Sequence, residues 1–168
     1  MKRISIIFIM SFLSACSAYS QENFKWTAFL HQTGMYYTSG RVTSDGFGLG
    51  LGVHALHKSQ VAGQVDVNIL WGNGNAVTTR FALGYERKGK WAPGVYGTFN
   101  MIWGQRVQML SETGEKPPMP AMAAGIRVTP LKFITKSGYI SALELGYGFG
   151  PEKAMSLEFS ILTAGIYF

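Results

Sequence analysis

The chain has 168 residues, enough for one domain, and a formal net charge of +6. Charged residues make up only 14% of it, well below the roughly 25% of soluble domains. Basic residues cluster only at 87–90, which argues against a nucleic-acid partner. No run approaches the ~18 apolar residues of a membrane-spanning helix. The single cysteine, Cys16, excludes an intrachain disulfide.

The first 20 residues have the pattern of a signal peptide. Lys2 and Arg3 precede a short apolar core at 4–13, and small residues follow. Leu13-Ser14-Ala15-Cys16 resembles the lipobox of bacterial lipoproteins, in which cleavage leaves a lipidated Cys16 as the first residue. Cleavage after Ala18 or Ser20 is the alternative, and it would discard the cysteine. Either choice predicts an exported protein whose folded domain covers 21–168.

Beyond Gln21 the dominant period is two, which is typical of strands with unlike faces. In 61–71, for example, Val65, Val67 and Ile69 alternate with polar residues. Eight such segments are separated by turn-forming residues. They lie near 24–33, 46–56, 61–71, 77–86, 91–104, 120–129, 139–149 and 155–168. In the last segment the apolar parity changes near Ile161, which predicts a β-bulge there.

Three features indicate that the apolar faces point outward, toward lipid. The polar faces carry few charges, as a narrow barrel interior requires. The tryptophans lie at segment ends, as in the aromatic girdles of membrane barrels; they are Trp26, Trp71, Trp91 and Trp103. The chain also ends on alternating apolar residues and Phe168, and this tail resembles the insertion signal of outer-membrane barrels.

The whole pattern resembles the small outer-membrane barrels of the OmpA/OmpX type, although no motif specifies one family. The resemblance implies an all-β, antiparallel, eight-stranded transmembrane barrel in the bacterial outer membrane. Its partners would be outer-membrane lipid and the barrel-assembly machinery, which would read the C-terminal strand and Phe168. With both termini periplasmic, the loops near 34–45, 72–76, 106–119 and 150–154 face outward. The proline-rich loop 106–119 is the expected site for an extracellular partner.

Ionisable residues on the polar faces should pair inside the barrel, because isolated buried charges are costly. The expected interior network is His54, Asp66, Arg80, Arg127, Glu144 and Glu158, together with His31 and Arg106. A hairpin closing at Asn73-Gly74 puts Asn68 opposite Arg80 and Asp66 on the diagonal. A plug of paired side chains is favoured over a pore or ligand site, since eight strands leave room only for side chains.

Catalytic residues are not convincingly indicated, and neither a cofactor nor a metal is expected. His54, His57 and Ser59 are candidates for a base and nucleophile, but Ser59 falls in a turn. Glu144 and Glu158 are a possible carboxylate pair on adjacent strands. The sequence therefore favours a structural, adhesive or loop-binding barrel. A lipid-modifying outer-membrane enzyme and a lipid-anchored soluble calycin-like barrel holding an apolar ligand remain alternatives.

Overall fold

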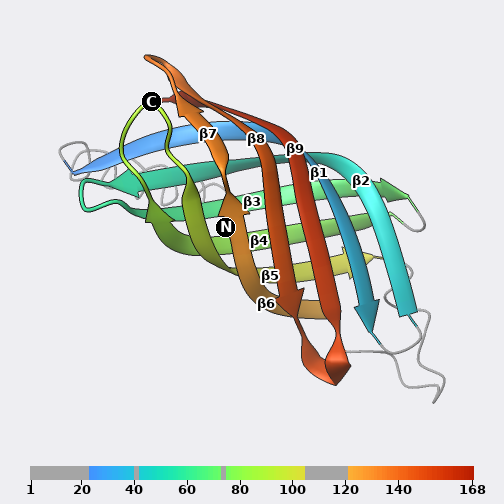
Figure 1. Cartoon of the computed structure of the whole chain (residues 1–168). Coiled ribbons are helices and arrows are strands. Elements are labelled where there is room, and N and C mark those ends of the chain that lie inside the picture. The colour runs from blue at the N-terminus through green and yellow to red at the C-terminus, as the bar shows by residue number, and fades with distance from the viewer. Residues whose placement is uncertain (1–22, 40–41, 73–74, 105–120) are drawn as a thin grey trace, which may run out of the picture.

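Period-two alternation folds the chain into strands that form one continuous antiparallel sheet (Figure 1). The computed structural model describes residues 23–39, 42–72, 75–104 and 121–168. The strands are β1 (Phe24–Ser39), β2 (Val42–His57), β3 (Val61–Gly72), β4 (Ala76–Glu86), β5 (Gly94–Gly104), β6 (Ala121–Thr129), β7 (Leu131–Ile134), β8 (Gly138–Phe149) and β9 (Met155–Tyr167). A 3-10 turn, Pro151–Lys153, precedes β9.

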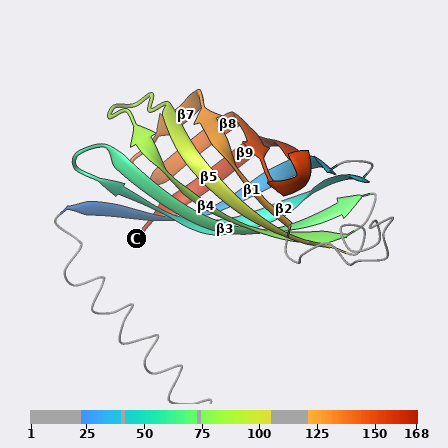
Figure 2. The same ribbon diagram turned by 90° about the horizontal axis from the view of Figure 1, so that it is seen from below.

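The sheet closes into a barrel of eight strands, as the sequence predicted. Apart from β6 and β7, each strand pairs with its neighbour in the chain, and β1 pairs with β9. β6 and β7 pair with β8 in one continuous register, so they are two halves of a single barrel strand. Figure 2 shows the closed, tilted sheet from below. Closure leaves no unpaired sheet edge.

The two ends of the barrel differ. The terminal end holds Asn23, Phe168 and the short turns at 57–61, 86–94 and 134–138, and it lies on the left of Figure 1. The loop end holds the connections between β1 and β2, β3 and β4, β5 and β6, and β8 and β9. All the residues of the terminal end from 23 onward are described.

The first hairpin is longer than predicted. The prediction of a loop at 34–45 is wrong for the described residues 34–39 and 42–45. They belong to strands, because β1 continues to Ser39 and β2 begins at Val42. The inward face of β1 continues with Met35 and Tyr37, which are both buried. Conversely, the segment predicted from residue 91 begins at Gly94, because Pro93 has no N–H for the ladder. Trp91 instead forms an isolated bridge with Phe133.

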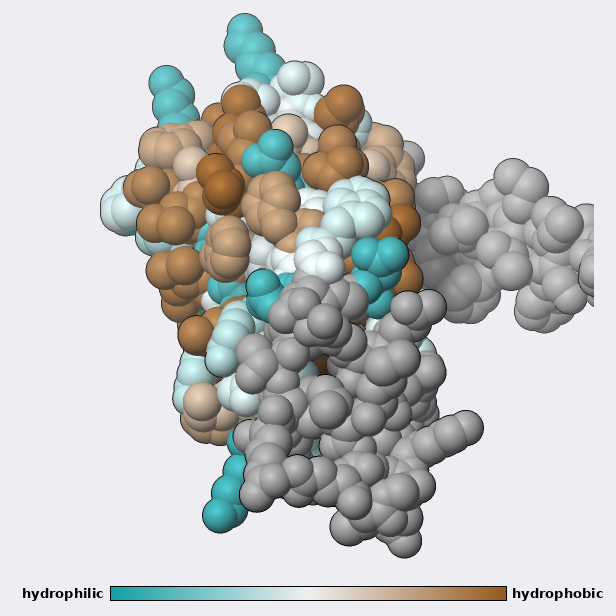
Figure 3. Space-filling model, turned by 90° about the vertical axis from the view of Figure 1, so that its right-hand side faces the viewer, coloured by the Kyte–Doolittle hydropathy of each residue, from teal (hydrophilic) through white to brown (hydrophobic). Residues whose placement is uncertain are grey.

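Apolar side chains point outward and polar side chains point inward. In β3 the pattern is regular: Val65, Val67 and Ile69 are exposed, while Asp66 and Asn68 are buried. Figure 3 shows apolar residues spread over much of the outer surface seen in that view. This arrangement is the reverse of a water-soluble barrel, in which the apolar face lines the interior.

The bulge predicted near Ile161 is confirmed. The β1–β9 register shifts between His31 and Thr33, and Ile161 and Leu162 both point outward. The extra residue moves the inward face of β9 from Ser160 to Thr163.

The irregularity extends from β9 into the next two strands around the barrel, β8 and the strand formed by β6 and β7. In β8, Leu143 adopts a φ of 58°, in the left-handed region that non-glycine residues seldom occupy. In the adjacent strand, Pro130 separates β6 from β7. Inward parity therefore changes from Arg127 and Thr129 to Lys132, which is buried. This band of irregular residues turns Lys132 into the barrel.

Candidate functional site: the charged interior

The middle of the barrel is occupied by charged and amide side chains that we call the central network. Asp66 on β3 lies directly opposite Arg80 on β4. Arg80 Nη2 lies 2.8 Å from Asp66 Oδ2, and Arg80 Nη1 lies 2.9 Å from Glu158 Oε2. Asn100 donates a hydrogen bond of 2.5 Å to Glu158. Arg80 therefore bridges carboxylates from two strands that are far apart in the sequence.

Polar neighbours complete the coordination of the Asp66 carboxylate. Asn68 Nδ2 donates to Oδ1 at 2.8 Å, and Gln64 Nε2 donates to Oδ2 at 3.0 Å. His31 Nε2 lies 3.8 Å from Oδ1. Charge-assisted contacts of this kind are needed to hold a carboxylate away from water.

The register predicted for the hairpin of β3 and β4 was wrong by two residues along β3. Asn68 faces Thr78, and Asp66, rather than Asn68, faces Arg80. A shift of two residues keeps each side chain on its predicted face. It also brings the carboxylate and the guanidinium into direct opposition, so that the predicted diagonal pair becomes a facing pair.

Arg127 and Glu144 form a further ion pair inside the barrel. Arg127 faces Gly146 across β6 and β8, and its guanidinium reaches the Glu144 carboxylate diagonally. Both side chains are almost completely buried. Glu144 and Glu158, considered above as a carboxylate pair, thus contact different arginines.

A second group, the terminal cluster, lies inside the barrel near its terminal end. Glu86 is its centre and is fully buried. Its Oε2 lies 2.8 Å from His54 Nε2 and accepts a hydrogen bond of 2.6 Å from the Tyr96 hydroxyl. Its Oε1 lies 2.8 Å from Lys132 Nζ, and that ammonium lies 3.9 Å from the centroid of the Tyr139 ring.

The alternation of the sequence predicted His54 in the interior network, but Glu86 and Lys132 were not among the predicted residues. For Glu86 the signal was available, because it shares alternating parity with Arg80 on the same strand. For Lys132 no such signal was available, because the inward face changes parity at the break between β6 and β7.

Apolar side chains fill the interior toward the loop end. This layer consists of Met35, Tyr37, Leu70, Ala76, Ile102 and Ala154, all buried. The described interior therefore has three successive layers: apolar toward the loops, ionic in the middle, and ionic with aromatic rings toward the termini.

The four tryptophans lie at both ends of the strands. Trp26 and Trp91 are near the terminal end, whereas Trp71 and Trp103 are near the loop end. The Trp91 indole donates a hydrogen bond of 2.8 Å to the Pro130 carbonyl. Phe168 is exposed, and its N–H donates to the Trp26 carbonyl at 3.3 Å.

The remaining candidates do not converge with these groups. His57 Nδ1 lies 2.7 Å from Ser59 Oγ in an exposed turn, whereas His54 lies inside the barrel. Within the described part of the chain, no three His, Cys, Asp or Glu side chains are grouped as a metal would require. Cys16, Arg106, Gly74, the signal-peptide region and loop 106–119 lie outside the described residues.

No protein-family model and no curated protein matches the sequence. Solved structures do match the fold. Neisserial surface protein A is 12% identical with a TM-score of 0.60, and the match covers 86% of this chain and 97% of that one. The N-terminal β-barrel domain of Pseudomonas aeruginosa OprF is 16% identical with a TM-score of 0.56, covering 84% and 97%.

A third match has the same architecture. The attachment invasion locus protein Ail of Yersinia pestis is 10% identical with a TM-score of 0.54, and the match covers 87% of this chain and 99% of that one. Closure, strand number and near-complete coverage agree across all three. The chain therefore has the fold of the small, eight-stranded outer-membrane β-barrels.

Proposed function

We propose that this protein spans the bacterial outer membrane as a plugged barrel and presents its loop end as a binding surface. The observation that carries the proposal is the division between an apolar outer face and an ionic interior. Only helices and closed barrels satisfy every backbone polar group within lipid. A belt of outward Val, Leu, Ile and Phe between tryptophans is what a bilayer accommodates.

The paired interior supports a plug rather than a pore. Arg80 is held by Asp66 and Glu158, and the apolar layer at the loop end adds Leu70 and Ile102. An eight-stranded barrel has an interior that side chains can fill. Ions would have to break these pairs to pass, so the function is expected at the surface of the barrel.

A binding role for the loops follows from the same division. Loops on a rigid scaffold commonly carry recognition, and the segment between β5 and β6 is the longest that separates two described strands. Ail, which has the same fold, is described as an attachment invasion locus protein. We therefore propose an adhesive or scaffolding role with an extracellular partner at 106–119. Assembly would begin with recognition of β9 and Phe168.

The alternatives from the sequence have less support. A soluble calycin-like carrier needs an apolar interior, whereas this interior is largely polar. A lipid-modifying enzyme needs a nucleophile and base near the lipid surface. His57 and Ser59 contact each other in an exposed turn, but they are only two residues apart in the chain, and such a contact is a local feature of the turn. Lipid A from a deletion strain, compared with wild type by mass spectrometry, tests for such an activity.

The topology is tested by labelling intact cells with a membrane-impermeant maleimide. Cysteines replacing Asn75 and Lys153, at the loop end, should react from outside. A cysteine replacing Lys136, at the terminal end, should react only after lysis. Equal labelling of all three positions before lysis would contradict the proposed orientation.

The plug is tested by recording the purified protein in planar bilayers. We expect no steady conductance from wild type. A steady, ion-selective current that changes with Arg80→Gln would contradict the plug and favour a channel.

A further inference from the structure

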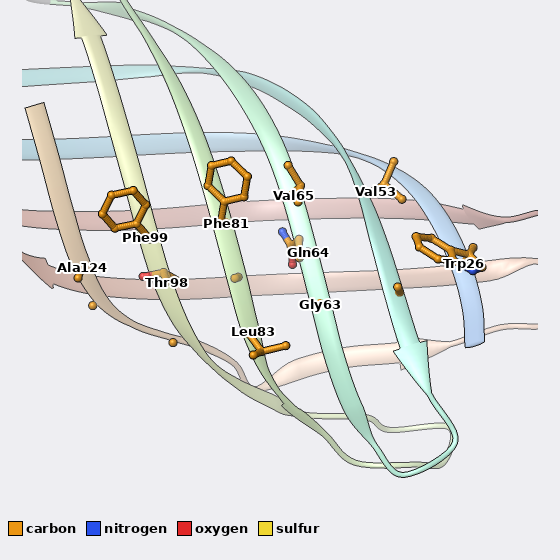
Figure 4. Close-up of a pocket in the computed structure, with 14 residues that line it drawn as sticks. Trp26, Val53, Gly63, Gln64, Val65, Phe81, Leu83, Thr98, Phe99 and Ala124 are labelled. Carbon is orange, nitrogen blue, oxygen red and sulfur yellow. The ribbon is translucent and has the colours of Figure 1, made fainter. Parts of the chain in front are cut away.

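The outer face of the barrel has a groove where small residues interrupt the apolar belt. Gly63 and Gly97 lie on either side of Leu83, in adjacent strands and in register. The hollow has a volume of about 630 Å³. It lies among larger outward side chains (Figure 4), which are Trp26, Val53, Val65, Phe81 and Phe99. A Cβ added to Gly63 would meet no atom within 4 Å, so this space is open.

A second hollow adjoins the groove at the terminal end. Its volume is about 540 Å³, and Trp26 lines both hollows. Unlike the groove, it is lined by cations, with Lys25, Lys58 and Lys88 around it. The apolar groove therefore continues past the Trp26 indole to this second, basic hollow at the rim of the barrel, which we call the basin.

The charge of this rim is one-sided. Six exposed cations lie at the terminal end: Lys25, Lys58, Arg87, Lys88, Lys90 and Lys136. Among the described residues of this end, Glu86 is the only acidic side chain, and it is buried against His54 and Lys132. The described side chains of the rim therefore carry an excess of positive charge, which attracts anions.

We infer that the groove and the basin together bind one anionic phospholipid of the leaflet at the terminal end. One acyl chain would lie over Gly63 and Gly97, and the phosphate would contact the ammonium groups of Lys58 and Lys88. This inference rests on the proposed membrane-spanning function. Its physical basis is that one lipid has an apolar chain that suits the groove and an anionic headgroup that suits the basin. The two hollows meet at Trp26.

A second copy of the chain fits this surface less well. A two-fold contact would apply the same patch to itself. It would bring the basic rims of both copies together, with like charges opposed. An anionic lipid instead supplies the charge that the rim lacks.

Quenching of Trp26 by brominated lipids tests the inference. The protein carries Trp71→Phe, Trp91→Phe and Trp103→Phe, so that Trp26 is the only tryptophan. It is reconstituted in phosphatidylcholine containing either brominated phosphatidylglycerol or brominated phosphatidylcholine. We expect phosphatidylglycerol to associate at least about fivefold more strongly, the factor that one lysine near an anionic lipid surface supplies.

Two kinds of variant separate the headgroup from the chain. Replacing Lys25, Lys58 and Lys88 by Gln should remove the preference for phosphatidylglycerol. Gly63→Leu should fill the groove and weaken quenching by both lipids. Thr79→Leu adds an outward side chain on β4 that is not among those lining the groove, so it should change neither quantity.

Failure of the lipid inference can be distinguished from failure of the proposed membrane-spanning function. Equal quenching by both lipids in the parent protein overturns the lipid inference and leaves the membrane barrel intact. Quenching that decreases as the protein-to-lipid ratio rises identifies a second copy as the occupant and also overturns it. An absence of quenching by either lipid, with no heat-dependent shift on a gel, overturns the membrane-spanning function itself.

Discussion

Asp66 and Arg80 face each other across β3 and β4, and two guanidinium nitrogens contact the same carboxylate oxygen at 2.8 and 2.9 Å. The third nitrogen of Arg80 contacts Glu158 on β9. One arginine thus connects strands on different sides of the barrel and balances two carboxylates. The stability of the interior is expected to depend on this residue more than on either acid.

A double-mutant cycle tests that expectation. Asp66→Asn should lower the free energy of unfolding by about 3–5 kcal/mol if the site is fully dry, because Arg80 loses a buried partner. The single variant Arg80→Gln should lower the free energy of unfolding by more than Asp66→Asn does, since both Asp66 and Glu158 then lose their cation. The double variant should be less destabilised than the sum of the two. Urea unfolding in detergent or lipid measures all four proteins.

The matched control for this cycle is Thr79→Ala, which changes an outward side chain beside Arg80 and should alter stability little. Strict additivity of Asp66→Asn and Arg80→Gln would show that the two side chains are not coupled. That outcome would mean that the central network does not stabilise the barrel through this ion pair.

The terminal cluster makes a parallel prediction. Glu86→Gln leaves the buried Lys132 ammonium without a carboxylate, so it should destabilise strongly. Adding Lys132→Met should recover part of the loss, because no buried cation then remains unpaired. Lys88→Gln, at an exposed position two residues away, serves as the control and should be nearly neutral. Thermal unfolding followed by circular dichroism compares the four proteins; a double variant worse than Glu86→Gln would argue against the pair.

Two glycines should respond oppositely to the same substitution. A Cβ at Gly48 would overlap the backbone carbonyl of Ile69, so Gly48→Ala should destabilise by about 1–3 kcal/mol through overpacking. A Cβ at Gly63 meets open space. Gly63→Ala should therefore be neutral or stabilising by up to about 1 kcal/mol, because the unfolded chain loses entropy. Similar urea midpoints for the two variants would contradict this packing.

Alternation in the sequence predicted which residues face inward, because strands have a strict period of two. It also predicted the bulge, since two successive outward residues, Ile161 and Leu162, break that period. The register of β3 against β4 was not predictable, because any shift of two residues preserves both faces. Lys132 was missed because the strand is interrupted at Pro130, after which the inward parity reverses.

Whether the apolar outer face lies in a bilayer can be measured by depth-dependent fluorescence quenching. Single-tryptophan proteins would carry native Trp71, native Trp91 or Val67→Trp, with the other tryptophans replaced by Phe. Val67 lies midway along the outward face of β3. We expect Val67→Trp to be quenched best by spin labels near the ends of the acyl chains, and Trp71 and Trp91 to be quenched best by labels near the headgroups. Equal quenching at both depths, or efficient quenching of Val67→Trp by aqueous iodide, would contradict this placement in a bilayer.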